Sequence, residues 1–438
     1  MRRPRTGKGN LPAALRWALA FYEAAWAVAT PFLRRNPRLR DGWDQRVLRR
    51  PLPRADIWIQ AASVGEGYLA RELMKAGGGF GRHRVLATTG TRQGMEILAG
   101  EFRWEPRFFP LDRPSLMARA VDQVRPRVAV LLETELWPGH LAALRSFGVP
   151  VLLLNGRIAE RSLEGYRRVG GVWRHLRPDQ VAAISPADAD RFAALFGSWG
   201  ISVMPNIKFD RIDIPAMERE GGSPPSDDRE TDPPPWFAPG APVLVLGSVR
   251  QEEEEAVFRV LTGIREQIPD AIVALVPRHL QRVEAWGERL SRLGIPWRRR
   301  SELSESTPPG TVAVWDTFGE LGRLYACADA VFVGGSLAPL GGQNFMEPLA
   351  AGVVPVVGPS ISNFAWVGEW IFRRGLVVRT RNADEAATAL LAQLRDPPDQ
   401  AVIRRQIRDF VSDRSGGART AAEMVWEFLS LSGPLREK

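Results

Sequence analysis

The sequence predicts an α/β protein made of two Rossmann-like domains with parallel sheets that face each other across a cleft. Two observations carry this prediction. Residues 56–62 and residues 241–247 each form an apolar run that ends in a short turn and is followed by a helical pattern. After each start, further short apolar runs alternate with helical patterns, which is typical of parallel sheets covered on both faces. Ligands of such sheets bind beyond the carboxyl ends of the strands, so we expect the active site there.

The expected elements follow in chain order. After 56–62, the first half has apolar runs at 85–89, 128–132, 151–154 and 181–184, and after 241–247 the second half has them at 272–276, 330–333 and 354–357. Residues 211–240 are rich in proline and glycine and form a linker. We therefore predict an N-terminal domain over 51–210, a C-terminal domain over 241–410, and a helix over 411–438 that packs back on the N-terminal domain. A length of 438 residues fits this, at ~150 residues per domain.

The positive charge of the chain is concentrated at its start. Residues 1–50 hold twelve lysines and arginines against three acids, an excess that equals the net charge of +9 of the whole chain. A nucleic-acid-binding protein usually spreads a basic stripe over its folded domain. No nucleic-acid partner is therefore predicted.

The basic residues of this segment flank an apolar stretch, residues 17–33, whose only charge is Glu23. The stretch is shorter than the ~20 apolar residues that a spanning helix needs. We predict that residues 1–50 form a membrane-associated segment, in which an interfacial helix places its arginines on anionic headgroups. The alternative is an ordinary core helix beside basic neighbours.

Cysteine and histidine usage argues against several classes of site. Cys327 is the only cysteine, and the four histidines do not lie at metal-ligand spacing, so neither a disulfide scaffold nor a metal site is expected. The glycine signatures of dinucleotide-binding and P-loop proteins are also missing from the sequence. We therefore predict no metal and no cofactor.

Carboxylates follow two of the expected strands. Glu66 ends the turn Ser63-Val64-Gly65-Glu66 and opens a helix, where it could serve as a general base; charge compensation at a helix N-terminus would equally explain it. Glu133 and Glu135 follow the strand that ends at residue 132, and they share a side if the chain stays extended. They are either a capping acid in a solvated loop or acids that orient the acceptor or Glu66.

Arginines follow two further strands. Arg157 and Arg161 lie four residues apart and are expected to share a helix face, where they suit a phosphorylated or carboxylated ligand or pair with the glutamates at 160 and 164. In the second half, Arg278 follows a strand and could clamp a phosphate or carboxylate. His279 beside it is more typical of a structural hydrogen bonder.

The most informative segment is the glycine-rich stretch 334–348. Its four glycines in nine residues allow backbone N–H groups to converge as an anion nest, beside a helix N-terminus. Glu347 could accept hydrogen bonds from a ribose. The four consecutive glutamates at 252–255 are explained sufficiently as favourable charge at a helix start.

At these residues the chain resembles the 3-deoxy-D-manno-octulosonic acid (Kdo) transferases of lipopolysaccharide assembly. The resemblance runs from about residue 10 to the C-terminus. It rests on six motifs in order: Ser63-Val64-Gly65-Glu66, Glu133-Thr134-Glu135-Leu136-Trp137-Pro138, Ile207-Lys208-Phe209-Asp210, Pro277-Arg278-His279, Asp316-Thr317-Phe318-Gly319-Glu320-Leu321, and the segment from Gly334 to Pro348.

The resemblance implies a glycosyltransferase-B fold and an inverting, metal-independent transfer of Kdo from CMP-Kdo to a lipid A precursor, at the cytoplasmic face of the cell inner membrane. The base falls on Glu66, and Glu135 is expected as a second catalytic residue. The expected donor contacts are Ser248, Arg278, His279, Phe318, Gly319, Gly335, Ser336, Asn344 and Glu347. The expected acceptor contacts are Ser63, Gly65, Arg92, Arg157 and Arg161.

The chain departs from the family pattern at two donor-side positions. Gln343 stands where the family usually has histidine before Asn-x-x-Glu-Pro, and Arg250 ends a segment that in the family reads Ser-Thr-His. Two alternatives therefore stay open beside Kdo transfer: a glycosyltransferase of the same fold with a different nucleotide sugar, and a non-catalytic membrane-bound scaffold.

Overall fold

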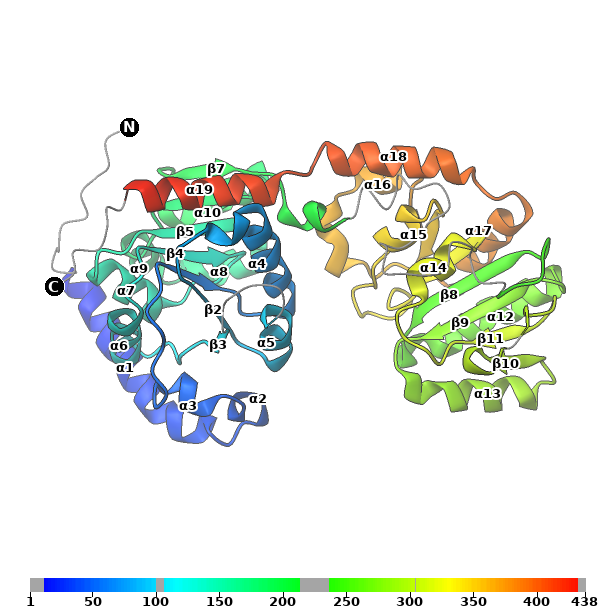
Figure 1. Cartoon of the computed structure of the whole chain (residues 1–438), viewed down its shortest axis with the longest axis horizontal. Helices are drawn as coiled ribbons and strands as arrows, with labels where there is room; N and C mark the ends of the chain where they lie inside the picture. Colours follow the sequence, from blue (N-terminus) through cyan, green and yellow to red (C-terminus); the bar gives the residue numbers. More distant parts are fainter. Residues whose placement is uncertain (1–11, 100–105, 213–235, 304, 432–438) are drawn as a thin grey trace. The chain divides into compact units, whose positions relative to one another are not determined.

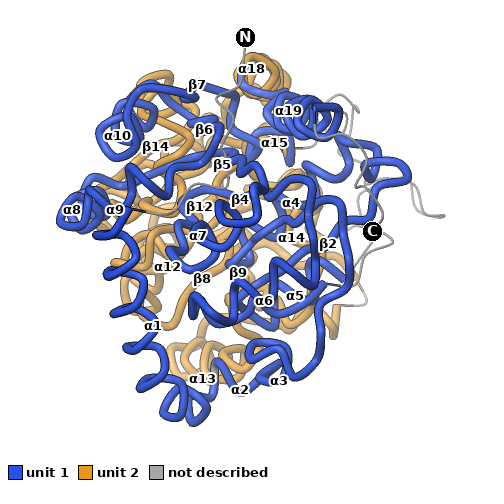
Figure 2. The backbone as a smooth tube through the Cα atoms, turned by 90° about the vertical axis from the view of Figure 1, so that its left-hand side faces the viewer, with its two compact units in different colours: residues 1–211, 414–438 blue, residues 212–413 orange. Residues whose placement is uncertain are grey.

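The computed structural model describes residues 12–99, 106–212, 236–303 and 305–431. The chain divides into two compact units, coloured separately in Figure 2. Unit 1 consists of Met1–Arg211 with Arg414–Lys438, and unit 2 of Ile212–Asp413. Each unit is built on one seven-stranded sheet, and helices cover its faces (Figure 1). The predicted pair of parallel α/β domains is therefore confirmed.

The sheet of unit 1 has the strand order β3-β2-β1-β4-β5-β6-β7, and all its pairs are parallel. All five residues of the central strand, Val128 to Leu132, are buried, as expected for a strand with helices on both faces of the sheet. The strands are β1 (Ile57–Gln60), β2 (Val85–Thr89), β3 (Arg107–Phe108), β4 (Val128–Leu132), β5 (Val151–Gly156), β6 (Gln180–Ala183) and β7 (Ile201–Val203).

Two apolar cores lie on the two faces of this sheet, because neighbouring side chains of a strand point to opposite faces. Trp58 belongs to one core, and Ile57 and Ile59 belong to the other. The covering helices are α1 (Ala13–Leu33), α2 (Pro37–Arg40), α3 (Trp43–Arg46), α4 (Val64–Ala76), α5 (Arg92–Leu98), α6 (Pro114–Val124), α7 (Pro138–Ser146), α8 (Glu160–Arg167), α9 (Gly170–His175), α10 (Pro186–Phe196) and α19 (Gly417–Leu431).

Helix α19, the last helix of the chain, belongs to unit 1 and packs against α4. Its residues Ala421 and Val425 are fully buried in the core that contains Ile57 and Ile59. Asp210 holds the start of the helix, since its carboxylate accepts the N–H of Gly416 at 2.5 Å and the N–H of Ala418 at 2.8 Å. An acid at this position also faces the positive end of the helix dipole.

Unit 2 repeats the design with the strand order β10-β11-β9-β8-β12-β13-β14, again all parallel. The strands are β8 (Val243–Val249), β9 (Ile272–Pro277), β10 (Trp297–Arg299), β11 (Val312–Val314), β12 (Ala330–Val333), β13 (Pro355–Val357) and β14 (Val378–Arg379). The helices are α12 (Glu254–Gln267), α13 (Val283–Arg292), α14 (Leu321–Ala326), α15 (Met346–Ala350), α16 (Trp370–Arg373), α17 (Ala383–Arg395) and α18 (Gln400–Ser412).

Helix α1 contains the apolar stretch singled out in the sequence. One side of it packs on α6 and α9: the Tyr22 hydroxyl donates to Asp112 at 3.1 Å, and Glu23 accepts the N–H of Ser115 at 2.9 Å. No helix in the described ranges is long and apolar enough to cross a membrane.

The other side of α1 is apolar and open. Trp17, Phe21, Val28 and Phe32 have exposed fractions of 75%, 80%, 69% and 65%. At 100° per residue these four side chains fall within an arc of about 60°. They form one continuous row, which we call the apolar stripe.

Candidate active site

Three of the sequence motifs meet at one edge of the unit 1 sheet. Glu66 follows β1, Glu133 follows β4, and Arg157 follows β5. Because β1, β4 and β5 are adjacent and parallel, their carboxyl ends lie at the same edge. This is the edge at which ligands of open α/β sheets bind.

Glu66 is held at the start of α4 by the residues that precede it. The Ser63 side chain accepts the N–H of Glu66 at 3.3 Å and so caps the helix. The carboxylate of Glu66 accepts the N–H of Ala62 at 2.6 Å and the Ser63 hydroxyl at 3.0 Å. Only 7% of Glu66 is exposed. A carboxylate has about four acceptor positions, so these contacts orient Glu66 and still leave room for a further proton donor.

The surroundings of Glu66 raise its pKa from 4.5 to about 7. Burial is the largest cause, since it disfavours the charged form. The negative charges of Glu135 and Glu133 add to the rise, and the hydrogen bonds from Ala62 and Ser63 oppose it. A carboxyl group with this pKa is ionised in part at neutral pH and is suited to accept a proton.

Glu133 sits at a turn that brings a cation into the site. Its backbone has φ +53°, in the left-handed region that few non-glycine residues adopt. Its carboxylate lies 2.6 Å from the ammonium of Lys208 in η2 (Ile207–Arg211). Lys208 therefore supplies a positive charge to a cluster that otherwise consists of three acids.

Glu135 is oriented by two neighbours. The Trp137 indole N–H donates to it at 2.6 Å, and the side chain of Gln60 at the end of β1 lies close enough to lower its pKa. Gln60 is itself fixed by Thr88, whose hydroxyl donates to the amide oxygen at 2.5 Å. Burial still raises the pKa of Glu135 above its ordinary value. The chain turns at Glu133 instead of staying extended, so the condition under which Glu133 and Glu135 would share a side is not met.

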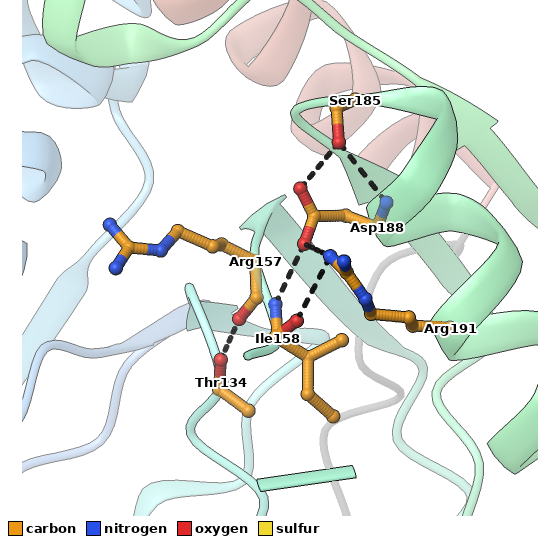
Figure 3. A network of polar contacts seen from close by, with 6 residues as sticks. All are labelled: Thr134, Arg157, Ile158, Ser185, Asp188 and Arg191. Carbon is orange, nitrogen blue, oxygen red and sulfur yellow. Dashed lines mark hydrogen bonds and ion pairs between the residues drawn. The ribbon is translucent and has the colours of Figure 1, made fainter. Parts of the chain in front are cut away.

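The expectation that Arg157 and Arg161 share a helix face is wrong, because α8 begins only at Glu160. Figure 3 shows what holds the chain before the helix. The Thr134 hydroxyl donates to the carbonyl oxygen of Arg157, and Asp188 accepts the N–H of Ile158 at 3.0 Å. These contacts tie the loop after β4 and helix α10 to the loop after β5. The guanidinium of Arg157 points away from this network (Figure 3).

The remaining predicted acceptor residues lie around the same sheet edge. Ser63 and Gly65 are exposed at the start of α4, and a Cβ atom on Gly65 would meet nothing closer than 3.8 Å. Arg92 opens α5 after β2 and lies 3.6 Å from Asp41 and 3.7 Å from Glu96. Arg161 is exposed on α8.

In unit 2, the N–H groups of the glycine-rich segment do converge on an anion, but the anion is part of the chain. The carboxylate of Glu253, which is 2% exposed, accepts the N–H groups of Gly335, Ser336 and Leu337, the last two at 3.1 Å. Gly334 is required here because a Cβ atom would lie 2.5 Å from the carbonyl oxygen of Ser248. Favourable charge at a helix start therefore explains only part of the role of Glu253, which also holds the glycine-rich loop.

Ser336 is fully buried. Its hydroxyl donates to the carbonyl oxygen of Val333 at 2.7 Å and accepts the N–H of Gly358 at 2.8 Å. Ser336 therefore has a structural role, because it holds the loop after β12 against the loop after β13. Its contact with the donor stays a prediction. Gly335 is buried as well, and its N–H is used by Glu253.

Most of the other predicted donor residues are open at the carboxyl ends of the unit 2 strands. Arg278 and His279 are exposed after β9, and Phe318 is 77% exposed before Gly319, whose φ is +84°. The Asn344 amide donates to the exposed Glu347 at 2.8 Å. Ser248, at the end of β8, has φ +55°, a conformation that non-glycine residues often adopt at functional sites.

Several contributors were not expected from the sequence. In the sequence, Lys208 is only part of a motif and Gln60 only part of a strand. The position of Glu253 predicts no more than a favourable charge at a helix start. Their partners are far along the chain, and no short-range pattern in the sequence signals such a contact.

Comparison with known proteins agrees with this geometry. Residues 41–211 match the family model described as 3-deoxy-D-manno-octulosonic-acid transferase (kdotransferase). The chain is 30% identical over 398 residues to the 3-deoxy-D-manno-octulosonic acid transferase of Bordetella pertussis, covering 87% of this chain and 89% of that protein. It is 26% identical to the enzyme of the same name from Haemophilus influenzae, covering 86% and 88%.

Solved structures share the two-unit fold. A glycosyltransferase from Rickettsia africae matches with a TM-score of 0.56 at 11% identity, covering 87% of this chain and all of that one. HepE from Anabaena, solved in complex with UDP, matches with a TM-score of 0.55 at 15% identity, covering 86% and 100%. The chain belongs to the 3-deoxy-D-manno-octulosonic acid transferase family and is a glycosyltransferase.

Proposed function

We propose that this enzyme transfers Kdo from CMP-Kdo to a hydroxyl group of a lipid A precursor, with Glu66 as general base. One observation carries the proposal: within a chain of the Kdo transferase family, the glutamate at the ligand-binding edge of unit 1 is oriented by Ala62 and Ser63 and has a pKa of about 7.

The chemistry is a single displacement. Glu66 takes the proton of the acceptor hydroxyl, whose oxygen attacks the anomeric carbon of Kdo as the bond from that carbon to the CMP oxygen breaks. The bond that forms and the bond that breaks lie on opposite faces of the sugar, so the anomeric configuration inverts. CMP departs with the bonding electron pair and is stable as an anion, which makes a dedicated general acid unnecessary. The proposed step uses no metal.

The acids near Glu66 add to the rise in its pKa that burial causes. Glu135, buried and oriented by Trp137, raises the proton affinity of Glu66 by its negative charge. Glu133 also raises this pKa, and Lys208 opposes the contribution of Glu133 by pairing with it. Contacts with the acceptor are assigned to the half-buried Arg157 and to exposed groups around this edge: Ser63, Gly65, Arg92 and Arg161.

Unit 2 holds the donor in this proposal. The exposed guanidinium of Arg278 suits the phosphate or the carboxylate of CMP-Kdo, and His279 lies beside it. Glu347, oriented by Asn344, suits the ribose hydroxyls. The backbone at Phe318, Gly319 and Ser248 completes the contacts, and the buried Gly335 shapes the loop after β12 through the hydrogen bond from its N–H to Glu253.

A lipid acceptor lies in a membrane, and α1 has features suited to binding a membrane surface. Its apolar stripe is suited to the acyl boundary, while the arginines near its end suit anionic headgroups. We propose that the enzyme works at the cytoplasmic face of the inner membrane with α1 lying in the interface.

The experiment that tests this function is mass spectrometry of the lipid formed from CMP-Kdo and a tetraacylated lipid A precursor. We expect the mass of Kdo to be added by the wild-type enzyme, and the rate to fall by about 10²–10⁴-fold in Glu66→Gln, the range for loss of a general base. Glu72→Gln, on the same helix, is the matched control. An unmodified precursor, or full activity of Glu66→Gln, would contradict the proposal.

A second donor remains a candidate because Gln343 and Arg250 replace two histidines of the family pattern. Thermal unfolding with CMP or with UDP separates the two, since only a ligand of the folded state raises the melting temperature. We expect CMP to stabilise the protein more than UDP does. Nucleotide binding without any turnover would instead favour a non-catalytic scaffold.

A further inference from the structure

Unit 1 contains a pocket that the proposed reaction leaves unused. It lies where α1 ends and the chain continues through α2 and α3, and its volume is about 980 Å³. Five arginines and a single acid are among its lining residues: Arg34, Arg35, Arg40, Arg49, Arg50 and Asp44. We call it the arginine pocket.

Within the described ranges, most charges of the arginine pocket have no acidic partner. Arg49 pairs with Asp44 at 3.3 Å. Arg34, Arg35, Arg40 and Arg50 have no carboxylate within ion-pair distance among the described residues. Like charges placed together repel one another, and a multivalent oxyanion would relieve that repulsion while accepting bidentate hydrogen bonds from guanidinium groups. The lining therefore points to a phosphate group.

The position of the pocket indicates that this phosphate belongs to a lipid. Pro31 lines the pocket, and the next residue along the chain, Phe32, belongs to the apolar stripe of α1. An anion bound here lies where a lipid that contacts the stripe with its acyl chains would place its headgroup.

A chain of contacts links the pocket to the edge that carries Glu66. Arg46, in the segment that forms the pocket, donates to the carbonyl oxygen of Gly90 at 2.7 Å. The N–H of Gly90 donates to the carbonyl oxygen of Ala62 at 3.1 Å, and the N–H of Ala62 donates to Glu66. The segment that carries Arg46 packs closely on Phe108 at Gly42. Only glycine fits there, because its φ is +69° and a Cβ atom would collide with Phe108.

We propose that the arginine pocket binds the phosphate monoester on the sugar headgroup of the lipid acceptor. Bound there, the phosphate anchors the headgroup at the sheet edge where Glu66 receives the acceptor hydroxyl. This inference rests on the proposed function for the identity of the acceptor, but phosphate binding itself does not require turnover.

Titration calorimetry on the full chain tests the proposal without catalysis. The probes are N-acetylglucosamine 1-phosphate, N-acetylglucosamine and inorganic phosphate. The variant is Arg35→Gln/Arg50→Gln, which removes two exposed guanidinium groups from the lining of the pocket. The control is Arg16→Gln/Arg119→Gln, which removes the same charge from exposed positions of unit 1 outside the pocket.

We expect the sugar phosphate to bind the wild type and the control alike. The pocket variant should bind it at least about tenfold more weakly, as expected for loss of charge-assisted hydrogen bonds. Equal binding by the pocket variant, or no binding by the wild type, would overturn the proposal. Inorganic phosphate that binds as tightly as the sugar phosphate would overturn the assignment to a glycolipid.

The transfer assay provides a second arm. With the phosphorylated acceptor in neutral micelles, the pocket variant should show a KM raised by about tenfold and little change in kcat, whereas the dephosphorylated acceptor should show no difference between variant and wild type. Equal effects on both acceptors would contradict the proposal. If the wild type transfers no sugar at all, the proposed function fails and the calorimetry still decides the pocket.

Discussion

The ammonium of Lys208 lies 2.6 Å from a carboxylate oxygen of Glu133. Through this contact, the segment that leads out of unit 1 reaches the acids at the end of β4. Glu133 and Glu135 both raise the pKa of Glu66, and we expect the charge of Lys208 to oppose the contribution of Glu133. The same segment also carries Asp210, which holds the start of α19.

Replacing Lys208 with methionine should move the pH dependence of transfer. Without the ammonium, the charge of Glu133 is uncompensated, so the pKa of Glu66 rises further, by on the order of one unit. The acid limb of the kcat/KM profile then shifts to higher pH, and Lys208→Arg should restore it. Lys75→Met removes a lysine elsewhere in unit 1 as the control. A profile of Lys208→Met that superimposes on the wild type would argue against this coupling.

Replacing Glu253 with glutamine should loosen the glycine-rich loop. The carboxylate accepts the N–H groups of Gly335, Ser336 and Leu337, whereas the amide has one acceptor oxygen and brings two competing donors. Each buried N–H left without a partner costs about 1–3 kcal/mol. Faster amide hydrogen exchange at 335–337 and weaker CMP binding are expected. The exposed neighbour Glu252→Gln is the control, and unchanged exchange in Glu253→Gln would refute the assignment.

The apolar stripe of α1 should control membrane binding. The double variant Phe21→Ser/Phe32→Ser removes two exposed aromatic side chains, each worth about 1.5–3 kcal/mol when fully buried. Partitioning onto vesicles of phosphatidylcholine with phosphatidylglycerol should weaken by at least about tenfold. The control is Val169→Ser/Val203→Ser, at exposed apolar positions elsewhere in unit 1. An equal loss in both double variants would show that the stripe has no special role.

Asp112 should make the stability of unit 1 depend on pH. Burial raises its pKa from 3.8 to about 7, although it accepts hydrogen bonds from Gly139, His140 and Tyr22. A raised pKa means that the stabilising contribution is complete below about pH 4 and is lost as the pH rises through 7.

Asp112→Asn has no such titration, so its stability relative to the wild type should improve between pH 4.5 and 7.5. The improvement should be on the order of 3 kcal/mol. Hydrogen bonds that asparagine fails to make lower its stability equally at both pH values and cancel from this comparison. Denaturant unfolding at the two pH values measures the change, and a constant difference between the two proteins would contradict the account.

The sequence predicts the central strands well. Residues 85–89, 128–132 and 330–333 form strands with the expected bounds, because a fully buried parallel strand is a continuous apolar run. The short outer strands β3, β7, β10, β11 and β14 were not expected, since two or three residues at or near a sheet edge leave no such run.

The features of the candidate site also fall into those that the sequence predicts and those that it does not. The turn 63–66 was predicted to present Glu66 at a strand end, because strand, turn and helix are neighbours in the chain. Long-range packing brings Glu133 and Glu135 close enough to Glu66 to add to the rise in its pKa. It also places Glu253 where it binds the N–H groups of residues 335–337. The spacing of Arg157 and Arg161 fits a helix, but Thr134 and Asp188 hold the chain before α8, so Arg157 lies outside the helix.

The pH dependence of kcat/KM for transfer from CMP-Kdo, measured for the wild type and for Glu66→Gln, tests the role of Glu66 most directly. We predict that the wild-type value rises with pH through a midpoint near 7, the pKa of the Glu66 carboxyl group, and that the variant is slow at every pH and lacks this rise. A variant that keeps the same midpoint, or a comparable rate, would show that another group removes the proton.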